Sequence, residues 1–408
     1  MNTLPYILIT MFFLSLLLNY ISMIRNRNSL EIVRDMGIGY NLGNTFDSYS
    51  NNLNEINTPE EQITLNGNTL PTKNMIKRLK KYGFKTIRFP VTWLHFIDDL
   101  GNINSEWMLL VKEVVDLILK QNLYCILNIY NDGYNGNWLS MGIEAKDKYI
   151  NLWKQIANEF KDYSDYLIFE SMNELYYYNQ ISFLNDYELL FTLNQAFVNT
   201  IRNSGGSNKE RLLIVAGAYD DLDMTSSSEY KFPIDPFNKL AISLHYYVPS
   251  LFVFELYFEP YTWTYDDGYI YYDEPTLTWG NQDEYFEIIT NFEIMKNTFV
   301  NKGIPVVISE VGVLTEERKK LESIREYLYM VFSISSDYDG IMSCLWDTSN
   351  KEYGDMNYYN RENDIWYYEK LNENFIDISK GKYVKSKDFY IKTHFETVTT
   401  PIMKELSK

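Results

Sequence analysis

The chain has few of the residues that bind metal ions or nucleic acids. Its 408 residues include three histidines and two cysteines. None of the histidines has a cysteine or acidic residue at the spacing of a metal site, so we expect neither a catalytic metal nor a cofactor. A glycine-rich phosphate loop is also absent from the sequence. The net charge of −18 disfavours binding to nucleic acid, because its phosphates would be repelled.

The rest of the composition fits a globular protein. Hydrophobic residues make up 46% of the chain, enough for a sizeable core. The length suits one large α/β barrel or two average domains, and neither a linker nor a second binding module is visible. The 36 tyrosines and 8 tryptophans suit surfaces that stack on sugar rings, but a coding bias is the better explanation for most of the tyrosines. A neutral polysaccharide is compatible with the negative charge, and we expect a monomer.

The N-terminal segment is strongly apolar. Residues 4–24 are almost uncharged and are followed by Arg25 and Arg27. This stretch is long enough to span a bilayer and resembles the core of a signal peptide, although it lacks a basic start and a clear cleavage site. Residues 1–27 are therefore interpreted as a signal peptide of a secreted protein or as a membrane anchor. A buried helix is the third possibility. The flanking arginines argue mildly against export.

The remainder of the chain alternates between predicted strands and predicted helices. Short apolar runs typical of buried strands recur eight times, at residues 37–43, 85–90, 125–130, 167–171, 211–217, 240–247, 305–310 and 340–346. Amphipathic helical stretches lie between most of them, at residues 74–81, 106–120, 149–160, 187–202, 285–301 and 316–332. The alternation predicts parallel βαβ units and, with eight strands, a single (β/α)8 TIM barrel. An open, doubly wound sheet is the alternative.

The two cysteines bear on the strand order. Cys125 lies in the third predicted strand and Cys344 in the eighth, and these strands are not neighbours in a closed barrel. We therefore expect two buried free thiols rather than a disulfide.

Polar residues gather at the C-terminal ends of the predicted strands. The active site of such a barrel is built from these ends. The residues concerned are Asn41, Asn44, Arg88, Asp132, Asn173, Glu174, His245, Tyr247, Glu310 and Trp346. The barrel would thus bring Glu174 and Glu310 together although 136 positions separate them.

Two glutamates at one barrel mouth suit the hydrolysis of a glycosidic bond. In a retaining glycosidase one carboxylate attacks the sugar, and the other acts first as an acid and then as a base. Arg88 is the candidate cation that keeps the nucleophile ionised. Asn173 suits a hydrogen bond to the sugar 2-hydroxyl, and Trp346 suits an apolar platform under the sugar ring.

The chain resembles glycoside hydrolase family 5, the cellulase family of retaining clan A. The matching motifs are MGIGYNLGNTFDS, GFKTIRFPVTWLHF, LIFESMNE, KLAISLHYYVP, GIPVVISEVG and CLWDTSN, in order over roughly residues 30–370. The resemblance implies an endoglucanase-like enzyme for residues 28–408, with Glu174 as acid/base and Glu310 as nucleophile. It also implies that Arg88, Asn173, His245, Tyr247 and Trp346 surround them.

Several positions depart from the family pattern. Tyr130 and Asn131 stand where the family usually has two histidines before Asp132. Leu175 replaces the proline that usually follows the acid/base. Smaller differences lie at Tyr40, in place of tryptophan, and at Val311, in place of phenylalanine.

Two functions remain open at this point. The first is a retaining endo-β-1,4-glucanase acting on β-glucan, with a mannanase or xylanase as the alternative within its class. The second is a carbohydrate-binding pseudoenzyme on the same barrel, suggested by Tyr130 and Asn131. Trp138, Tyr134 and Trp279, in loops after strands, are expected either to bind sugar or to pack internally. The aromatic segment 249–282 is expected either to cover the active-site face or to pack on itself.

Overall fold

The computed structural model describes the chain from residue 27 to residue 385, apart from internal gaps. The described ranges are 27–52, 55–134, 136–175, 183–254, 262–264, 270–272, 277–315, 319–349, 355–368 and 370–385. The apolar segment 4–24 lies outside these ranges, as does most of the segment 255–276. Among the helices that are described, none has an apolar stretch long enough to cross a membrane.

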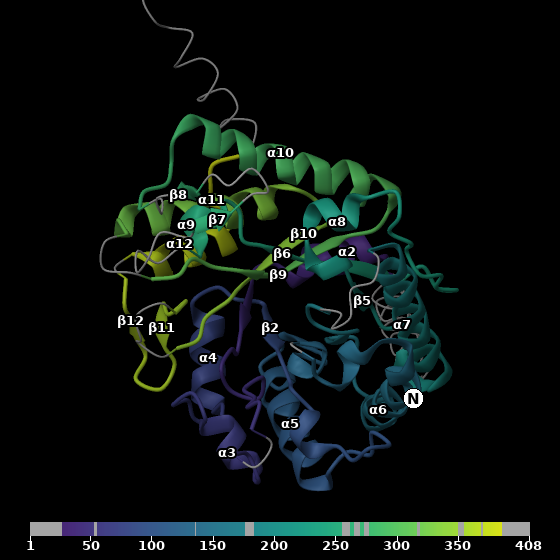
Figure 1. The fold of residues 1–408 in the computed structure, drawn as a ribbon. Coiled ribbons are helices and arrows are strands. Elements are labelled where there is room, and N and C mark those ends of the chain that lie inside the picture. Colours follow the sequence, from purple (N-terminus) through teal and green to yellow (C-terminus); the bar gives the residue numbers. More distant parts are fainter. Residues whose placement is uncertain are drawn as a thin grey trace, which may run out of the picture.

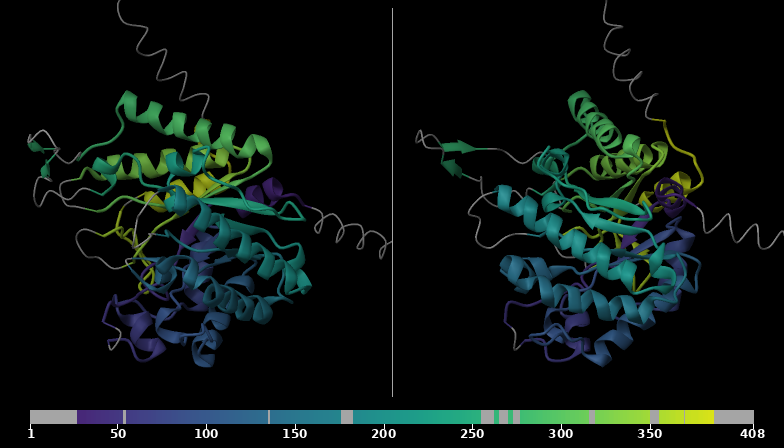
Figure 2. Two further views of the ribbon diagram at one scale, coloured as in Figure 1. Left: turned by 45° about the vertical axis from the view of Figure 1, so that its right-hand side comes forward. Right: turned by 90° about the vertical axis from the view of Figure 1, so that its right-hand side faces the viewer.

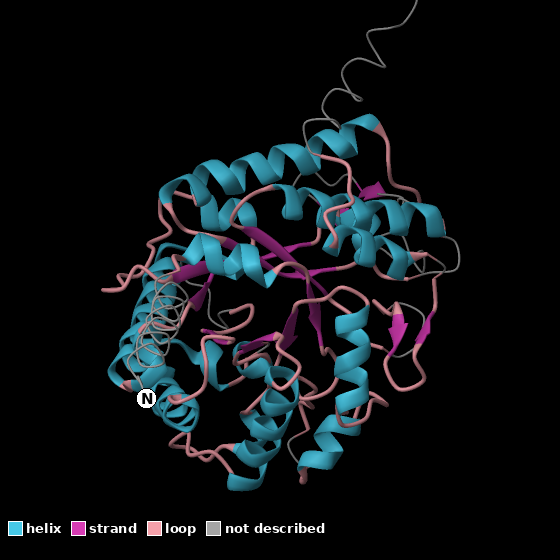
Figure 3. Cartoon of the chain, turned by 180° about the vertical axis from the view of Figure 1, so that it is seen from behind, coloured by secondary structure: helices cyan, strands magenta, loops and turns pink. Residues whose placement is uncertain are grey.

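Eight parallel strands form a closed barrel at the centre of the molecule, surrounded by helices (Figures 1 and 3). The strands are β1 (Gly39–Asn41), β2 (Thr86–Phe89), β3 (Tyr124–Leu127), β4 (Leu167–Glu170), β5 (Leu213–Ala216), β6 (Leu240–Tyr246), β9 (Val306–Val311) and β10 (Ile341–Leu345). Each strand pairs with its neighbours in chain order, and β10 pairs with β1 to close the ring. The barrel prediction is confirmed, and the open sheet is excluded.

The barrel helices cover the outside of the strands. They are α3 (Pro59–Thr64), α4 (Lys73–Lys81), α5 (Ser105–Leu119), α6 (Lys146–Phe160), α7 (Phe183–Asn203), α8 (Leu222–Ser226), α10 (Gln282–Thr298) and α11 (Leu321–Asp337). Short pieces complete the described fold: α9 (Ser250–Val253), the hairpins β7 (Thr262–Thr264) with β8 (Ile270–Tyr272) and β11 (Tyr359–Asn360) with β12 (Ile365–Trp366), and α12 (Leu371–Ser379). Figure 2 shows the β7–β8 hairpin standing away from the barrel.

Local sequence explains where several helices begin. Asn281 precedes α10, and its side chain accepts from the backbone N–H of Glu284, whose own carboxylate accepts from Asn281 N–H. This capping box satisfies donors that a helix start leaves open. The expected helix at 316–332 begins only at Leu321, because the backbone of Lys320 is extended there. The strand expected at 125–130 ends at Leu127, which leaves Tyr130 in the loop that follows.

The barrel strands are buried on both faces, as their apolar composition predicts. At the N-terminal end of the barrel, α2 (Ser29–Met36) lies against β10, and its Ile32, Val33 and Met36 join one buried cluster with residues of β3, β4, β5, β6, β9 and β10. Side chains therefore fill this end, and the polar residues lie at the opposite one.

Both cysteines are buried free thiols, as expected, and lie on strands that do not pair. The position of Cys344 also explains why residue 39 is a glycine. A Cβ at Gly39 would lie 2.2 Å from Cys344 Sγ, so only glycine lets β1 and β10 approach this closely.

Candidate active site

The C-terminal ends of the strands bring the expected polar residues to one mouth. Arg88 lies on β2, His245 on β6 and Glu310 on β9. Asn173 and Glu174 follow β4 directly, and Trp346 follows β10. Asn41, the last residue of β1, and Tyr247, which follows β6, complete the group. Hydrogen bonds and ring contacts link these residues into one network.

Arg88 lies at the centre of the network. Its side chain is fully buried, and its Nη1 donates to Glu310 Oε1 at 2.7 Å and to Asn41 Oδ1 at 3.1 Å. Its Nε donates to Glu170 Oε2 and its Nη2 to Asn173 Oδ1, both at 2.7 Å. Burial alone would lower the pKa of Arg88, but the charges of the two glutamates outweigh it and raise that pKa well above its ordinary value. Arg88 is therefore a fixed cation.

Glu310 is the most strongly held carboxylate at the mouth. It is 3% exposed, and its Oε1 accepts from Arg88 and, at 2.9 Å, from the Tyr130 hydroxyl. Its Oε2 accepts from the Tyr247 hydroxyl at 2.9 Å. The pKa values of both tyrosines are raised well above their ordinary value, first by burial and next by the charge of Glu310, so both hydroxyls remain donors. Three donors from three strand ends thus hold this carboxylate in a fixed position.

Glu174 has a different environment. Its side chain is 24% exposed, and its Oε1 lies 2.7 Å from His245 Nδ1. The same nitrogen lies 3.5 Å from Glu310 Oε2. A ligand atom from each of Glu174, His245 and Glu310 lies within 4.8 Å of the other two. The two glutamates therefore face one another across a short gap, with His245 beside both.

His245 is positively charged at neutral pH. Burial lowers its pKa, but the charges of Glu310 and Glu174 outweigh this and raise the pKa to about 9. Its Nε2 lies 3.8 Å from Oδ2 of Asp220, in the turn after β5. Asp220 is 1% exposed, and burial raises its pKa to about 8. This shift favours the protonated form of Asp220 near neutral pH, and no sequence pattern marked this residue.

An aromatic platform lies next to Glu310. The rings of Tyr130 and Trp346 are parallel to within 4°, with their centroids 5.6 Å apart. The guanidinium of Arg88 lies 5.6 Å from the centroid of the Tyr130 ring. Trp346 remains partly exposed, so its position suits contact with a sugar ring beside the two glutamates.

Asp132 and Trp138 form a pair close to the mouth. Asp132 is fully buried, and its two oxygens accept from the Trp93 backbone N–H at 2.8 Å and from Trp138 Nε1 at 2.6 Å. Burial raises the pKa of Asp132 to about 6, against these hydrogen bonds. Since both oxygens are occupied, Asp132 orients the partly exposed Trp138 ring, over which Lys148 Nζ lies at 5.0 Å.

The other two aromatic candidates differ in exposure. Tyr134 is 41% exposed and makes an edge contact with Tyr49, so it remains available at the surface. Trp279 is 5% exposed and packs against Tyr285 and Tyr327, which makes it part of the core.

Sequence reasoning missed Glu170. This side chain is fully buried on β4, where Arg88, Asn128 Nδ2 at 2.9 Å and Ser243 Oγ at 2.8 Å donate to it. A signal was available, because a charge inside an apolar strand has to be paired. The sequence also identified Tyr130 only as a departure from a pattern, and gave no indication that its hydroxyl reaches Glu310.

Glu174, His245 and Glu310 also have the spacing of metal ligands. The charge of His245 and the adjacent Arg88 cation oppose a further positive ion at this place. The arrangement instead suits one charged nucleophile and one group that transfers protons.

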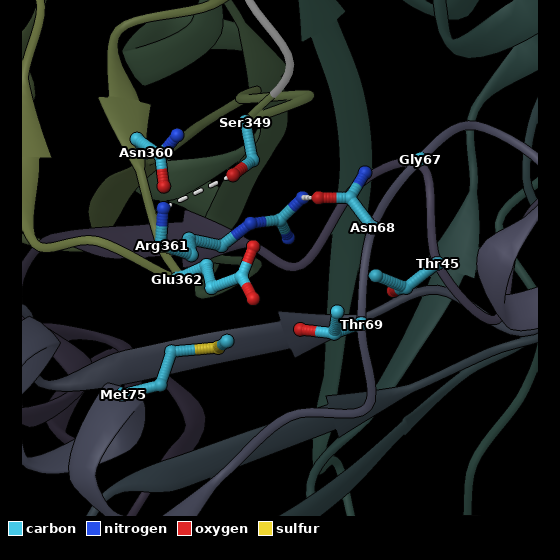
Figure 4. Close-up of a pocket in the computed structure, with 9 residues that line it drawn as sticks. All are labelled: Thr45, Gly67, Asn68, Thr69, Met75, Ser349, Asn360, Arg361 and Glu362. Carbon is cyan, nitrogen blue, oxygen red and sulfur yellow. Dashed lines mark hydrogen bonds between the residues drawn. The ribbon is translucent and has the colours of Figure 1, made fainter.

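A small polar pocket lies at the same end of the barrel, between the loops after β1 and β10 (Figure 4). Arg361, which is 1% exposed, donates through Nη2 to the Gly43 carbonyl, to Asn68 Oδ1 and to the Thr348 carbonyl. Its backbone N–H donates to Ser349 Oγ at 3.0 Å. These bonds join the loop after β1 to the loop after β10, which contains Trp346, so Arg361 stabilises the position of both loops.

A family model agrees with this geometry. The model of the cellulase family, glycosyl hydrolase family 5, matches residues 43–352. Among curated proteins, endoglucanase A of Clostridium longisporum is 31% identical over 363 residues. That match covers 86% of this chain and 66% of the relative, slightly less than two thirds of the relative's length.

Solved structures give the same result. A GH5-4 broad specificity endoglucanase from an uncultured bovine rumen ciliate is 54% identical, with a TM-score of 0.83, and the match covers 87% of this chain and 99% of that one. A mutant glycoside hydrolase 5 lichenase from Caldicellulosiruptor sp. F32, in complex with cellotetraose, is 28% identical. Its TM-score is 0.77, with 87% of this chain and 96% of that chain covered.

Proposed function

The chain belongs to the cellulase family, glycosyl hydrolase family 5, and we propose that it is a retaining endo-β-1,4-glucanase in which Glu310 is the nucleophile and Glu174 the acid/base. The short separation of the two carboxylates carries this proposal. Retaining enzymes hold the two carboxyl groups about 5–5.5 Å apart, whereas inverting enzymes need about 6.5–9.5 Å for a water between them. Oxygen atoms of Glu174 and Glu310 that lie within 4.8 Å of one another fit the retaining geometry.

The environments of the two glutamates support their division of labour. Glu310 is buried and accepts from Arg88, which favours a charged nucleophile. Glu174 is partly exposed and shares a 2.7 Å hydrogen bond with His245 Nδ1, so a proton lies on this pair. Such a position suits a group that gives a proton to a leaving oxygen and later takes one from water.

The proposed reaction has two steps, which these positions support. First, Glu310 attacks the anomeric carbon, the glycosidic bond breaks, and Glu174 protonates the departing oxygen. Then Glu174 takes a proton from water, the water oxygen attacks the same carbon, and Glu310 leaves as a carboxylate. Asn41 and Asn173 both accept from Arg88 through their Oδ1 atoms. We assign Asn173 to the sugar 2-hydroxyl, and Asn41 to the positioning of Arg88.

The substrate we propose is a neutral β-glucan. Trp346 beside Glu310, together with Trp138 and Tyr134, offers partly exposed rings on which sugars stack. The net charge of −18 does not oppose a neutral polymer. The similar ciliate enzyme is named for broad specificity, and the similar lichenase was solved with cellotetraose. Carboxymethyl cellulose, lichenan and xyloglucan are therefore the substrates to test first, with mannan and xylan as alternatives.

Residues 1–27 are proposed to direct export, either as a cleaved signal peptide or as a retained membrane anchor, with the catalytic domain over 28–408. N-terminal sequencing of protein from the expressing cells distinguishes the two. A mature chain that begins near residue 28 means cleavage and secretion, and an intact start in the membrane fraction means an anchor. Size-exclusion chromatography tests the expected monomer.

Hydrolysis and stereochemistry test the enzyme proposal together. We expect the wild type to release reducing ends from at least one of the glucans, and NMR to detect the β-anomer first. Glu310→Gln and Glu174→Gln, which preserve side-chain shape, should each remove almost all of this activity. If the wild type binds a glucan but releases no more reducing sugar than Glu310→Gln, the chain is a carbohydrate-binding pseudoenzyme. Initial release of the α-anomer would exclude the retaining mechanism.

A further inference from the structure

Tyr130 contacts the proposed nucleophile in a way that the family pattern does not provide, because a histidine usually stands there. Its hydroxyl donates to Glu310 Oε1 at 2.9 Å, and its side chain is buried. The ring lies flat on Trp346, and its backbone N–H donates to the Val91 carbonyl at 2.8 Å. The hydroxyl is thus fixed by the ring stacking and by the backbone.

The two oxygens of Glu310 are consequently unlike. Oε1 accepts from both Arg88 Nη1 and the Tyr130 hydroxyl. Oε2 accepts from the Tyr247 hydroxyl and lies 3.5 Å from His245 Nδ1, the nitrogen bonded to Glu174. Oε1 is therefore held on the side of Arg88, and Oε2 is the oxygen that faces the acid/base.

We propose that Tyr130 is a positioning residue for the nucleophile, which with Arg88 holds Glu310 Oε1 so that Oε2 forms and breaks the bond to the sugar. This inference rests on the proposed retaining mechanism. When the sugar is attached through Oε2, Oε1 is the carbonyl oxygen of an ester and a weaker acceptor. As water displaces the carboxylate, negative charge returns to Oε1, and the Tyr130 hydrogen bond strengthens. An interaction that is stronger in the transition state than before it accelerates that step.

Tyr130 therefore assists the second step more than the first. In Tyr130→Phe the ring remains stacked on Trp346 and only the hydroxyl is lost. With an aryl β-cellobioside whose leaving group departs easily, the second step limits the rate. We expect kcat to fall about tenfold, as for the loss of a hydrogen bond to a charged group. KM should fall with it, because the glycosyl-enzyme accumulates, and a burst of released phenol should appear.

The pH profile gives an independent measurement. Besides Tyr130, the titratable groups around Glu310 come from β2, β4 and β6 and are Arg88, Glu174, His245 and Tyr247, with Glu170 behind Arg88. Tyr130→Phe leaves all of these in place and removes one donor to the carboxylate. The acidic limb of kcat/KM should therefore move to higher pH.

The matched control is Tyr124, at the start of β3, whereas Tyr130 lies in the loop after this strand. Tyr124 donates its hydroxyl to Asp35 Oδ2 at 2.6 Å, at the opposite end of the barrel. Tyr124→Phe thus removes the same kind of bond without touching the mouth, and its kcat, KM and pH profile should equal those of the wild type. Tyr130→His serves as a second variant. Its imidazole is too short to reach Oε1 from the same backbone, so it should show the same joint fall in kcat and KM even if Tyr130→Phe does not fold.

The outcomes separate the two proposals. A wild type that hydrolyses no glucan refutes the proposed function itself. If the wild type is active while Tyr130→Phe or Tyr130→His retains its kcat, KM and acidic limb, only the role of Tyr130 is refuted. A fall in kcat with unchanged or higher KM, and no burst, would also overturn it, because the loss would then lie in the first step or in binding.

Discussion

The replacement of Arg88 by methionine tests the charge balance at the centre of the barrel. Arg88 and Glu170 are both fully buried, and Arg88 also donates to Glu310. Methionine keeps much of the side-chain volume but leaves two buried carboxylates without their cation. The loss of one partner from a buried ion pair costs about 3–5 kcal/mol of the free energy of unfolding. For a chain of 408 residues this corresponds to a fall in Tm of about 4–6 °C.

The assay is urea denaturation at pH 7, followed by circular dichroism, with a matched control and a repair. Arg34→Met removes an exposed ion pair with Asp339, and exposed pairs contribute about 0–1 kcal/mol. In the double variant, Glu170→Gln removes one of the two uncompensated charges, so it should restore roughly half of the stability lost in Arg88→Met. If the double variant is no more stable than Arg88→Met, the loss is one of packing, and the reasoning from charge is refuted.

Three further predictions concern other buried groups. Burial raises the pKa of Asp220 from the ordinary 3.8 to about 8, so between these pH values the folded state holds a proton that the unfolded state loses, and the stability of the wild type falls as pH rises. The stability of Asp220→Asn relative to the wild type should therefore increase across this window and stay constant above it. A difference in the free energy of unfolding, measured by urea denaturation, that does not change with pH would contradict the pKa shift. Gly39→Ala should cost about 1–3 kcal/mol because its Cβ meets Cys344 Sγ, and Cys344→Ala should recover part of this in thermal melts, whereas no recovery would mean that another contact decides. Burial raises the thiol pKa of Cys125 and of Cys344, so an aromatic disulfide reagent should label both only after denaturation, and rapid labelling of the native protein would show that the barrel opens.

The sequence predicted the barrel because each strand carries its own signal. An apolar run with no alternation, as in β5 or β9, requires burial on both faces, and eight such runs with helices between them leave few topologies. The polar residues at strand ends were predictable for the same reason. Once the strands are parallel, Glu174 and Glu310 meet at one end of the barrel whatever their separation in the chain.

The contacts behind the two glutamates were not predictable. Glu170 lies in the same run as other strand residues, and its partner Arg88 is 82 positions away on another strand. Asp220 lies in a turn, with a backbone φ of 50°, and no sequence motif marks it as a functional residue. Tyr130 is a similar case. The sequence showed only that a histidine expected at this position is absent, and only the structure shows that the tyrosine hydroxyl donates to Glu310.

The protonation of Asp220 bears on the chemistry as well as on stability. Burial raises the pKa of Asp220 to about 8. Burial lowers the pKa of His245, but the charges of Glu310 and Glu174 outweigh it and raise that pKa to about 9. Acidic side chains outnumber basic ones at the mouth, where Glu170, Glu174 and Glu310 lie beside Arg88 and His245. The total charge of this group does not change when a proton moves from His245 to Glu174. In the proposed reaction, such an acidic excess favours the positive charge that develops on the sugar ring in the transition state. Ionisation of Asp220 would favour the proton on His245 over Glu174. The burial that raises the pKa of Asp220 therefore favours transfer of the shared proton to the leaving oxygen of the proposed reaction.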